Sequence, residues 1–291
     1  MHARGVPPEA SFEWGSITKT VTGTLLALLA AERVVRLRTP LSELLPGARP
    51  LALEDLASHT SGLPRLLPSS ARFVAATWAV RQDPYAQVDA DRLLADLRRT
   101  RLRGRRYRYS NAGHGLLGLA LSRATGTPYE ELVQQHICVP LGLATVTTHD
   151  RAQLVQGHDR RGRSVPHWHF TEALAGCGAL RGSVHDLARW LCAAAGEAPE
   201  PLRSALAEAT RPRTRTRTAE VGLGWHRSHL GKLGLRSPDP DQPALLWHNG
   251  GTGGFRSFAA HDERTGRGVA VLAASKRSVD GLGVLLLPAS R

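Results

Sequence analysis

The sequence predicts an α+β fold, in which helices cover an antiparallel sheet. Apolar segments of helical length dominate the chain up to about residue 210, and short strand-like runs between Gly-rich or Asp/Gly turns follow. A run of helices followed by a run of strands is typical of this fold class. The 291 residues are enough to bury a substantial core. We expect a single domain over residues 1–291, with a helical lobe roughly at 20–210 and a sheet lobe formed by 1–19 and 215–291.

The N-terminal part should contain one short strand and one long buried helix. After a polar, proline-containing loop at 1–10, the strand is expected at 11–14. Segment 16–33 is apolar on nearly every side, which predicts a helix buried on most of its surface. A short helix at 53–59 should end at the turn sequence Thr-Ser-Gly-Leu-Pro of residues 60–64.

Several later helices are predicted from the residues at their ends. Thr127 with Glu130 three residues later, and Ser183 with Asp186, have the spacing of a capping box. In the segment Asp89–Arg99, acidic residues at the start and basic residues at the end fit the dipole of a helix. The expected helices are Asp89–Arg99, Ala112–Thr125 closed by Gly126, one from Thr127 through Gln135, and one from Ser183 to Ala194.

The C-terminal part has the pattern of an antiparallel meander. Short runs rich in β-forming residues are separated by turn residues, and Asp262–Gly266 has the composition of a hairpin turn. A closing amphipathic helix is expected at 279–287. The predicted strands are Val221–His229, Leu245–His248, Phe255–Asp262 and Gly268–Ser275.

The composition argues against several classes of function. The net charge of +13 comes almost entirely from arginine, with clusters at 98–108 and 211–217. These clusters contain Tyr107 as their one aromatic residue and lack the interleaved aromatic pattern of nucleic-acid-binding segments, so we expect no nucleic-acid partner. The three cysteines are widely spaced and form no Cys-x-x-Cys pair, which predicts buried thiols instead of disulfides or zinc ligands. We expect no metal and no cofactor.

No segment of the sequence has the length of a membrane span. The longest apolar run, Leu25–Ala31, is far shorter than the roughly 20 residues that a helical span needs. Residues 1–10 contain no apolar core of a signal peptide. The sequence as written therefore predicts a cytoplasmic protein without an integral membrane segment, and an exported or envelope-associated one if an N-terminal segment has been lost.

A serine and a lysine three residues apart open the long apolar helix. Ser16 and Lys19 should lie on one helical face, about one turn apart. A serine hydroxyl becomes an effective nucleophile when a neighbouring base takes its proton, and a desolvated lysine amine can serve. The backbone N–H at a helix start also favours an oxyanion on the acylating substrate. Because this spacing is common by chance, the alternative is a helix-capping serine beside a solvated lysine.

Two later segments add groups of a catalytic type. Tyr109 and Asn111 stand two apart on a tight loop, where a tyrosine could transfer a proton and an asparagine could fix a lysine or a substrate amide. The alternative is a turn with a packed tyrosine. His248 lies at the end of a strand, and Gly250 and Gly251 would let a substrate approach that strand and let an N–H point into a site.

In this order, Ser16-Ile-Thr-Lys19, Tyr109-Ser-Asn111 and His248-Asn-Gly250 resemble the three motifs of the penicillin-recognising serine hydrolases. This superfamily comprises β-lactamases, D-Ala-D-Ala peptidases and related esterases, and the tyrosine in the second motif is similar to its class C-type branch. The resemblance implies a β-lactamase/transpeptidase-like fold. Further matching stretches lie at 58–64, 140–143 and 178–183, so the resemblance runs over nearly the whole chain.

The resemblance also implies a role for each motif residue. Ser16 would be the acylated nucleophile, Lys19 its proton-handling partner, and Tyr109 the general base that returns a proton to the leaving group. The backbone N–H groups of Ser16 and Gly251 would form the oxyanion hole, and Asn111 would contact the substrate amide and Lys19. The implied substrate-binding residues are Asn111, His248, Gly250 and Gly251.

The sequence departs from the family pattern at two places. His248 stands where β-lactamases and peptidases of the family usually have a lysine, and a histidine with a pKa near about 6.5 is mostly neutral at neutral pH. Only fifteen residues precede Ser16, whereas the family places two strands and a helix there. Either the start of the chain is misplaced, or the N-terminal strands are missing, in which case the edge of the sheet should be incomplete.

These observations predict a serine hydrolase that cleaves an ester or amide, of the esterase or D-amino-acid peptidase type. Its partner would be a small-molecule or peptide ester or amide, and neutral esters should be preferred over β-lactams that bear a carboxylate. The alternative is a catalytically silent binding or sensor module with a β-lactamase-like fold.

Overall fold

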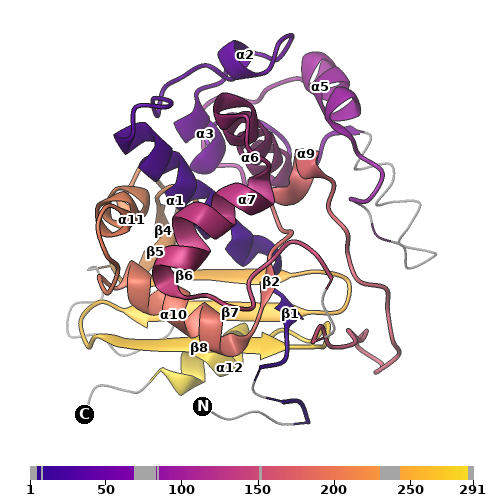
Figure 1. Cartoon of the computed structure of the whole chain (residues 1–291), viewed down its shortest axis with the longest axis vertical. Coiled ribbons are helices and arrows are strands. Elements are labelled where there is room, and N and C mark those ends of the chain that lie inside the picture. The colour runs from indigo at the N-terminus through magenta and orange to yellow at the C-terminus, as the bar shows by residue number, and fades with distance from the viewer. Residues whose placement is uncertain are drawn as a thin grey trace.

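The apolar segment that follows Ser16 forms the central helix of the fold. In the computed structural model, which describes residues 5–7, 9–68, 83, 85–150, 153–229 and 243–287, a short strand β1 (Phe12–Glu13) and a 3₁₀ turn η1 (Gly15–Ile17) lead into α1 (Thr18–Ala31). All residues of α1 from Thr18 to Leu29 are buried. The helix therefore lies inside the molecule, with the other helices around it (Figure 1).

Most of the helices lie on one side of the main sheet (Figure 1). Ser110 begins α6 by accepting a hydrogen bond from Gly113 N (2.9 Å), and Gly126 ends it in the left-handed conformation, as predicted. Asp89 likewise caps α5 through Arg92 N (2.8 Å). These helices are α2 (Leu41–Leu44), α3 (Leu53–Ala57), α5 (Ala90–Arg99), α6 (Asn111–Thr125), α7 (Tyr129–Val133), η2 (Gln134–Cys138), α8 (Val139–Leu141), α9 (Glu172–Ala175), α10 (Val184–Ala194) and α11 (Leu202–Thr210).

The capping box predicted at Thr127 is wrong. Helix α7 begins after Pro128, and no side chain caps it. Glu130 instead uses its carboxylate to accept hydrogen bonds from Thr147 Oγ1 (2.8 Å) and Thr148 N (2.7 Å). The carboxylate of Glu130 thus binds residues 147 and 148 and does not cap the start of the helix. The chain also stays helical beyond Gln135, through η2 and α8.

Half of the capping box predicted at Ser183 and Asp186 is confirmed. Ser183 accepts from Asp186 N (3.1 Å) at the start of α10. The carboxylate of Asp186 does not return to Ser183 N; it accepts from Thr145 N (2.7 Å) and Thr145 Oγ1 (2.6 Å). Thr145 Oγ1 in turn accepts from Ser183 N (2.8 Å), so a threonine from a distant loop joins the two halves of the box.

The C-terminal part forms an antiparallel sheet of six strands in the order β3-β4-β5-β6-β7-β8. The turn at Asp262–Gly266 connects β7 to β8, as predicted. Strand β8 is the last strand in this order and so forms one edge of the sheet, and its residues are exposed or only partly buried. The strands are β3 (Thr214–Arg215), β4 (Ala219–Val221), β5 (His226–His229), β6 (Pro243–Gly251), β7 (Arg256–Asp262) and β8 (Arg267–Ala273), and a separate pair joins β1 to β2 (Arg181–Gly182).

The strand predicted at Val221–His229 is wrong, because the structure divides it at a turn. β4 ends at Val221 and β5 begins at His226. Between them Gly224 has φ +78°, and a Cβ at this position would stand 2.2 Å from Lys19 O. The turn therefore packs directly against the start of α1, and only glycine allows that approach.

The two faces of the sheet pack against different helices. Leu246 and Ala259 belong to the large core that α1, α6 and α10 share. Leu245 and Phe258 point to the opposite face, where they pack with residues of α12 (Asp280–Leu286) (Figure 1). Adjacent residues on one strand thus serve two cores, as the alternation of side chains in a strand requires.

The predicted environment of the cysteines is correct for two of them. Cys138 and Cys177 are buried and form no disulfide within the described part of the chain, whereas Cys192 is exposed on α10 and corrects the prediction. It lies on the outer face of an amphipathic helix whose opposite face buries Trp190 and Leu191. Among the helices of the described residues, none is long and apolar enough to cross a membrane.

Candidate active site

Ser16 and Lys19 meet at the junction of η1 and α1. Lys19 Nζ donates a hydrogen bond to Ser16 Oγ (3.0 Å) and another to the carbonyl oxygen of Cys177 (2.5 Å). The lysine side chain is fully buried, while Ser16 remains partly accessible. The alternative of a solvated lysine is therefore excluded, and the amine is held on the serine oxygen by a carbonyl from a distant part of the chain.

Tyr109 is held beside this pair by the segment that begins at His59. His59 accepts from Arg108 N through its carbonyl (2.8 Å) and from Ser110 N through Nδ1 (3.1 Å), and its ring centre lies 4.5 Å from that of Tyr109. Lys19 Nζ lies 5.1 Å from the centre of the tyrosine ring. His59 thus fixes the backbone on both sides of Tyr109, at Arg108 and at Ser110.

Asn111 has a different partner from the one that the resemblance implies. Its amide nitrogen donates to Tyr85 Oη (2.9 Å), and no hydrogen bond between Asn111 and Lys19 is found within the described part of the chain. The carbonyl oxygen Oδ1 of Asn111 is buried without a hydrogen-bond partner there. This oxygen is therefore a buried acceptor, and the contact of Asn111 with Lys19 that the resemblance implies is not formed.

Gly250 and Gly251 bring strand β6 into direct contact with the turn that carries Ser16. A Cβ on Gly250 would stand 2.0 Å from Trp14 O and 3.1 Å from Ser16 N. On the other side, Gly15 has φ +54°, and a Cβ there would stand 2.7 Å from Gly251 N. The N–H groups of Ser16 and Gly251 are thus near one another because three glycines allow the two backbones to approach.

His248 lies on β6 at the wall of the same site and is buried. Its Nδ1 is 2.5 Å from the carbonyl oxygen of Asn249, and because a carbonyl only accepts, Nδ1 carries the proton. Burial, reinforced by His226 and Lys19, lowers the pKa of His248 well below its usual value. The ring is therefore neutral at neutral pH, and Nε2, which has no partner among the described residues, is a hydrogen-bond acceptor.

Three other buried histidines lie close to His248 and Tyr109. His226 is 5.0 Å from His248 between ring centres and bonds Tyr107 Oη through Nε2 (3.1 Å). The ring centres of His59 and His114 lie 4.7 Å apart. Burial lowers the pKa of all three, to about 4 for His226. The polar groups beneath the site are therefore uncharged rings, and the amine of Lys19 lies next to them.

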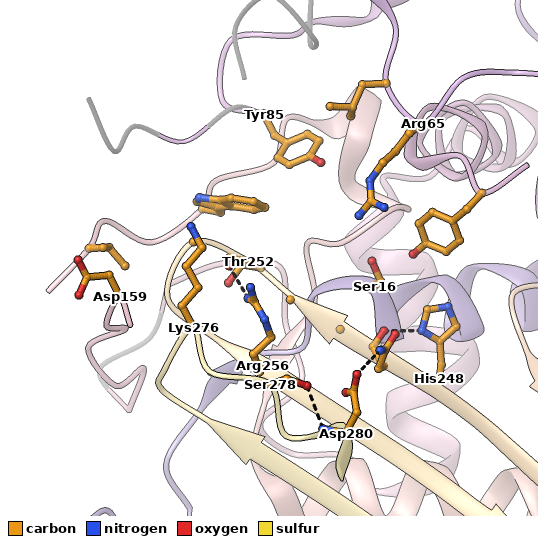
Figure 2. A pocket seen from close by; sticks show the side chains of 18 of the residues that line it. Ser16, Arg65, Tyr85, Asp159, His248, Thr252, Arg256, Lys276, Ser278 and Asp280 are labelled. Atoms are coloured by element: carbon orange, nitrogen blue, oxygen red, sulfur yellow. Dashed lines mark hydrogen bonds between the residues drawn. The ribbon is translucent and has the colours of Figure 1, made fainter. Parts of the chain in front are cut away.

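These residues border a cavity of about 990 Å³ (Figure 2). Of the residues predicted from the sequence, Ser16, Tyr109, His248, Gly250 and Gly251 line it, whereas Lys19 and Asn111 lie behind its wall. Sequence reasoning missed several lining residues that belong to no motif. They are Arg65, Tyr85, Trp168, Arg256 and Lys276.

Trp168 and Tyr85 form an aromatic wall of the cavity. Their ring centres lie 5.3 Å apart, and Phe170 stacks on Tyr85 at 4.5 Å. Glu13 holds the tryptophan backbone by accepting from Trp168 N (2.9 Å). The tryptophan between two histidines in the sequence is the one available signal for this wall, and it gives no indication of a partner so far away in the chain.

The chain matches a known family over almost its full length. A family model described as Beta-lactamase covers residues 1–284. The chain is 27% identical over 277 residues to the D-alanyl-D-alanine-carboxypeptidase/endopeptidase AmpH of Escherichia coli (84% of this chain, 66% of that protein). It is 26% identical over 300 residues to a beta-lactamase of Pseudomonas fluorescens (90% of this chain, 78% of that protein). It thus spans slightly less than two thirds of the length of the first of these relatives.

Solved structures share the fold. A class C beta lactamase from Rhodobacter sphaeroides superposes with a TM-score of 0.75 at 25% identity (94% of this chain, 82% of that one). A beta-lactamase/D-alanine carboxypeptidase from Yersinia pestis gives 0.76 at 26% identity (97% and 84%). A D-stereospecific amidohydrolase from Streptomyces gives 0.76 at 22% identity (97% and 87%), which shows the fold alone. The α+β fold is therefore that of the class C β-lactamases.

Proposed function

This chain belongs to the Beta-lactamase family, and from that premise we propose that it cleaves an ester or amide through an acyl-enzyme on Ser16. The observation that carries the proposal is the hydrogen bond of 3.0 Å between Lys19 Nζ and Ser16 Oγ, made by a fully buried amine. A lysine that is desolvated and fixed on a hydroxyl is an activator of serine nucleophiles. The partly accessible serine faces a cavity large enough for an organic substrate.

In the proposed reaction, Ser16 Oγ attacks the substrate carbonyl while Lys19 and Tyr109 take up its proton. The oxyanion of the tetrahedral intermediate accepts hydrogen bonds from the N–H groups of Ser16 and Gly251. Tyr109 returns a proton to the leaving oxygen or nitrogen, which gives the acyl-enzyme and the first product. Water then attacks the acyl carbonyl while the same groups take up its proton, and this proton passes to Ser16 Oγ as the bond from Oγ to the acyl carbon breaks, which releases the acid and the free serine.

We propose an esterase or D-amino-acid peptidase-like specificity in place of that of an ordinary β-lactamase. The neutral ring of His248 offers a hydrogen-bond acceptor where a lysine would offer a fixed positive charge. The first relative named above is a carboxypeptidase/endopeptidase, which supports an amide substrate as well as an ester.

The test is acylation and turnover with and without the nucleophile. We expect a fluorophosphonate to add its mass to Ser16 and 4-nitrophenyl acetate to be hydrolysed. Ser16→Ala should abolish the adduct and reduce the rate by much more than about a hundred-fold, because loss of a nucleophile normally costs more than that. A catalytically silent binding module would give no adduct, and a Ser16→Ala variant that kept more than about a hundredth of the rate would contradict the assignment.

A further inference from the structure

The charged residues around the cavity are mostly paired with one another or with the backbone. Arg163 Nε donates to Asp159 Oδ2 (2.9 Å), and Asp280 Oδ2 accepts from Asn249 Nδ2 (2.9 Å). Arg256 Nη1 donates to the carbonyl oxygens of Thr252 (2.9 Å) and Phe255 (2.6 Å). Figure 2 shows the bond of Arg256 to Thr252 and that of Asp280, both on the side of the cavity formed by the sheet.

Arg65 differs from these residues because its guanidinium extends into the cavity. Figure 2 shows its side chain entering from the wall opposite the sheet, with the guanidinium directed toward Ser16. Within the described residues, no carboxylate and no hydrogen-bond acceptor pairs with this guanidinium. Its charge is therefore available to a group that enters the cavity.

The position of Arg65 is fixed by the backbone and by Tyr109. The carbonyl oxygen of Arg65 accepts from Asn111 N (2.9 Å) and Ala112 N (3.3 Å) at the start of α6. Its guanidinium carbon lies 5.2 Å from the centre of the Tyr109 ring, a distance typical of a cation–π contact. The backbone of Arg65 is thus part of the frame of the site, and its guanidinium lies beside the ring of Tyr109.

We propose that Arg65 binds a carboxylate on the acyl part of the substrate and thereby determines specificity. This inference rests on the proposed acyl-enzyme function and names its substrate class, an ester or amide of a dicarboxylic or acidic acyl group. A planar guanidinium binds a carboxylate through two parallel hydrogen bonds, and such charge-assisted bonds are about twice as strong as neutral ones. The charge that His248 does not supply from the β6 wall comes, in this proposal, from the opposite wall.

The test compares two esters that differ at one end of the acyl chain. 4-Nitrophenyl hemiglutarate carries a terminal carboxylate, and 4-nitrophenyl valerate carries a methyl group in its place. We expect the wild type to prefer the hemiglutarate, and Arg65→Gln to reduce the ratio of the two kcat/KM values by about ten-fold or more, as expected for loss of a charge-assisted hydrogen bond. Arg65→Lys should retain part of the preference because it keeps the charge.

Arg203→Gln is the control, since it removes the same charge from a residue of α11 that does not line the cavity and is paired with Glu200 (2.9 Å). Its ratio should equal that of the wild type. An unchanged ratio in Arg65→Gln, with turnover that still depends on Ser16, would overturn the role of Arg65 and leave the proposed function intact. If the wild type hydrolyses neither ester, calorimetric binding of monomethyl glutarate to the wild type and to Arg65→Gln decides the role of Arg65. Equal affinities would then overturn it. The proposed function itself fails if 4-nitrophenyl acetate is not hydrolysed and the fluorophosphonate does not add to Ser16.

Discussion

At the scale of single residues, the burial of Lys19 is the feature that most constrains the chemistry. A buried amine needs partners, and Lys19 has two oxygen acceptors and the ring of Tyr109 nearby. The sequence spacing predicted that Ser16 and Lys19 would be neighbours. It could not predict the carbonyl of Cys177, because that contact joins residues far apart in the chain and depends on the packed fold.

We predict that Lys19 and Tyr109 act as one proton-transfer unit. Tyr109→Phe and Lys19→Ala should each reduce kcat by several orders of magnitude, and the double variant should be little worse than either, because residues that act as a unit are not additive. The measurement is kcat for 4-nitrophenyl acetate in the four proteins, with circular dichroism to verify folding. Losses that add on a logarithmic scale would show that the two residues act independently.

We also predict that His248 sets the preference against β-lactams. His248→Lys places a permanent cation on the β6 wall, so acylation by a penicillin should rise relative to hydrolysis of a neutral ester. The measurement is kcat/KM for both substrates in wild type and variant between about pH 5 and 8, around the ordinary histidine pKa. Because burial keeps the pKa of His248 low, the wild-type ratio should change little within this range. An unchanged ratio after the lysine substitution would exclude His248 as the determinant of this preference.

At the scale of elements, the sequence predicted those whose signals are local. Asp89 and Gly126 delimit helices as expected, because a cap depends on neighbours within one turn. The wrong predictions share one cause. The carboxylate of Glu130 accepts a hydrogen bond from Thr148 N, and the turn around Gly224 exists because the start of α1 occupies the adjacent space. Neither partner is visible in a local window of sequence.

The contact between β6 and η1 gives a prediction at this scale. In Gly250→Ala the new methyl would lie 2.0 Å from the backbone carbonyl oxygen of Trp14. A backbone atom cannot turn aside as a flexible side chain can, so β6 must move away from Ser16. We expect kcat to fall by about 100-fold or more, comparable to loss of one oxyanion-hole donor.

The matched control is Gly281→Ala on α12, where an added Cβ meets nothing within 4 Å. This variant should retain wild-type kcat and stability, because alanine is also the better helix former. A Gly250→Ala protein with wild-type kcat and a wild-type melting temperature would show that the close approach of the two backbones is not needed.

At the scale of the whole molecule, the large core includes residues from the helices and from the sheet, such as Leu25, Leu116 and Leu246. We therefore propose that the helical lobe and the sheet lobe form the single domain expected from the sequence. The sequence predicted this division because the change from helical to strand-like patterns is strong. It did not reveal that four histidines from separate segments would be buried together, since their positions in the chain show no common spacing.

The buried histidines lead to a prediction about the pH dependence of folding. In the native state burial lowers their pKa, whereas in the unfolded chain a histidine titrates near about 6.5. Between the two values the unfolded state binds more protons, so the free energy of unfolding should fall as the pH decreases below about 6.5 and should be fully retained above it. For His226 this window extends down to about 4.

His114 isolates this effect, because both ring nitrogens are buried without a hydrogen-bond partner among the described residues. In His114→Leu the free energy of unfolding should fall less between about pH 6.5 and 5 than in the wild type, by up to about 2 kcal/mol, the linkage contribution of one histidine over that range. The measurement is urea unfolding of each protein at both pH values, so that any packing cost of the leucine cancels within each protein. His185→Gln, which changes an exposed histidine on α10, should leave the wild-type pH dependence in place. If His114→Leu instead loses as much stability on acidification as the wild type does, protonation of His114 is not part of the acid sensitivity of the fold.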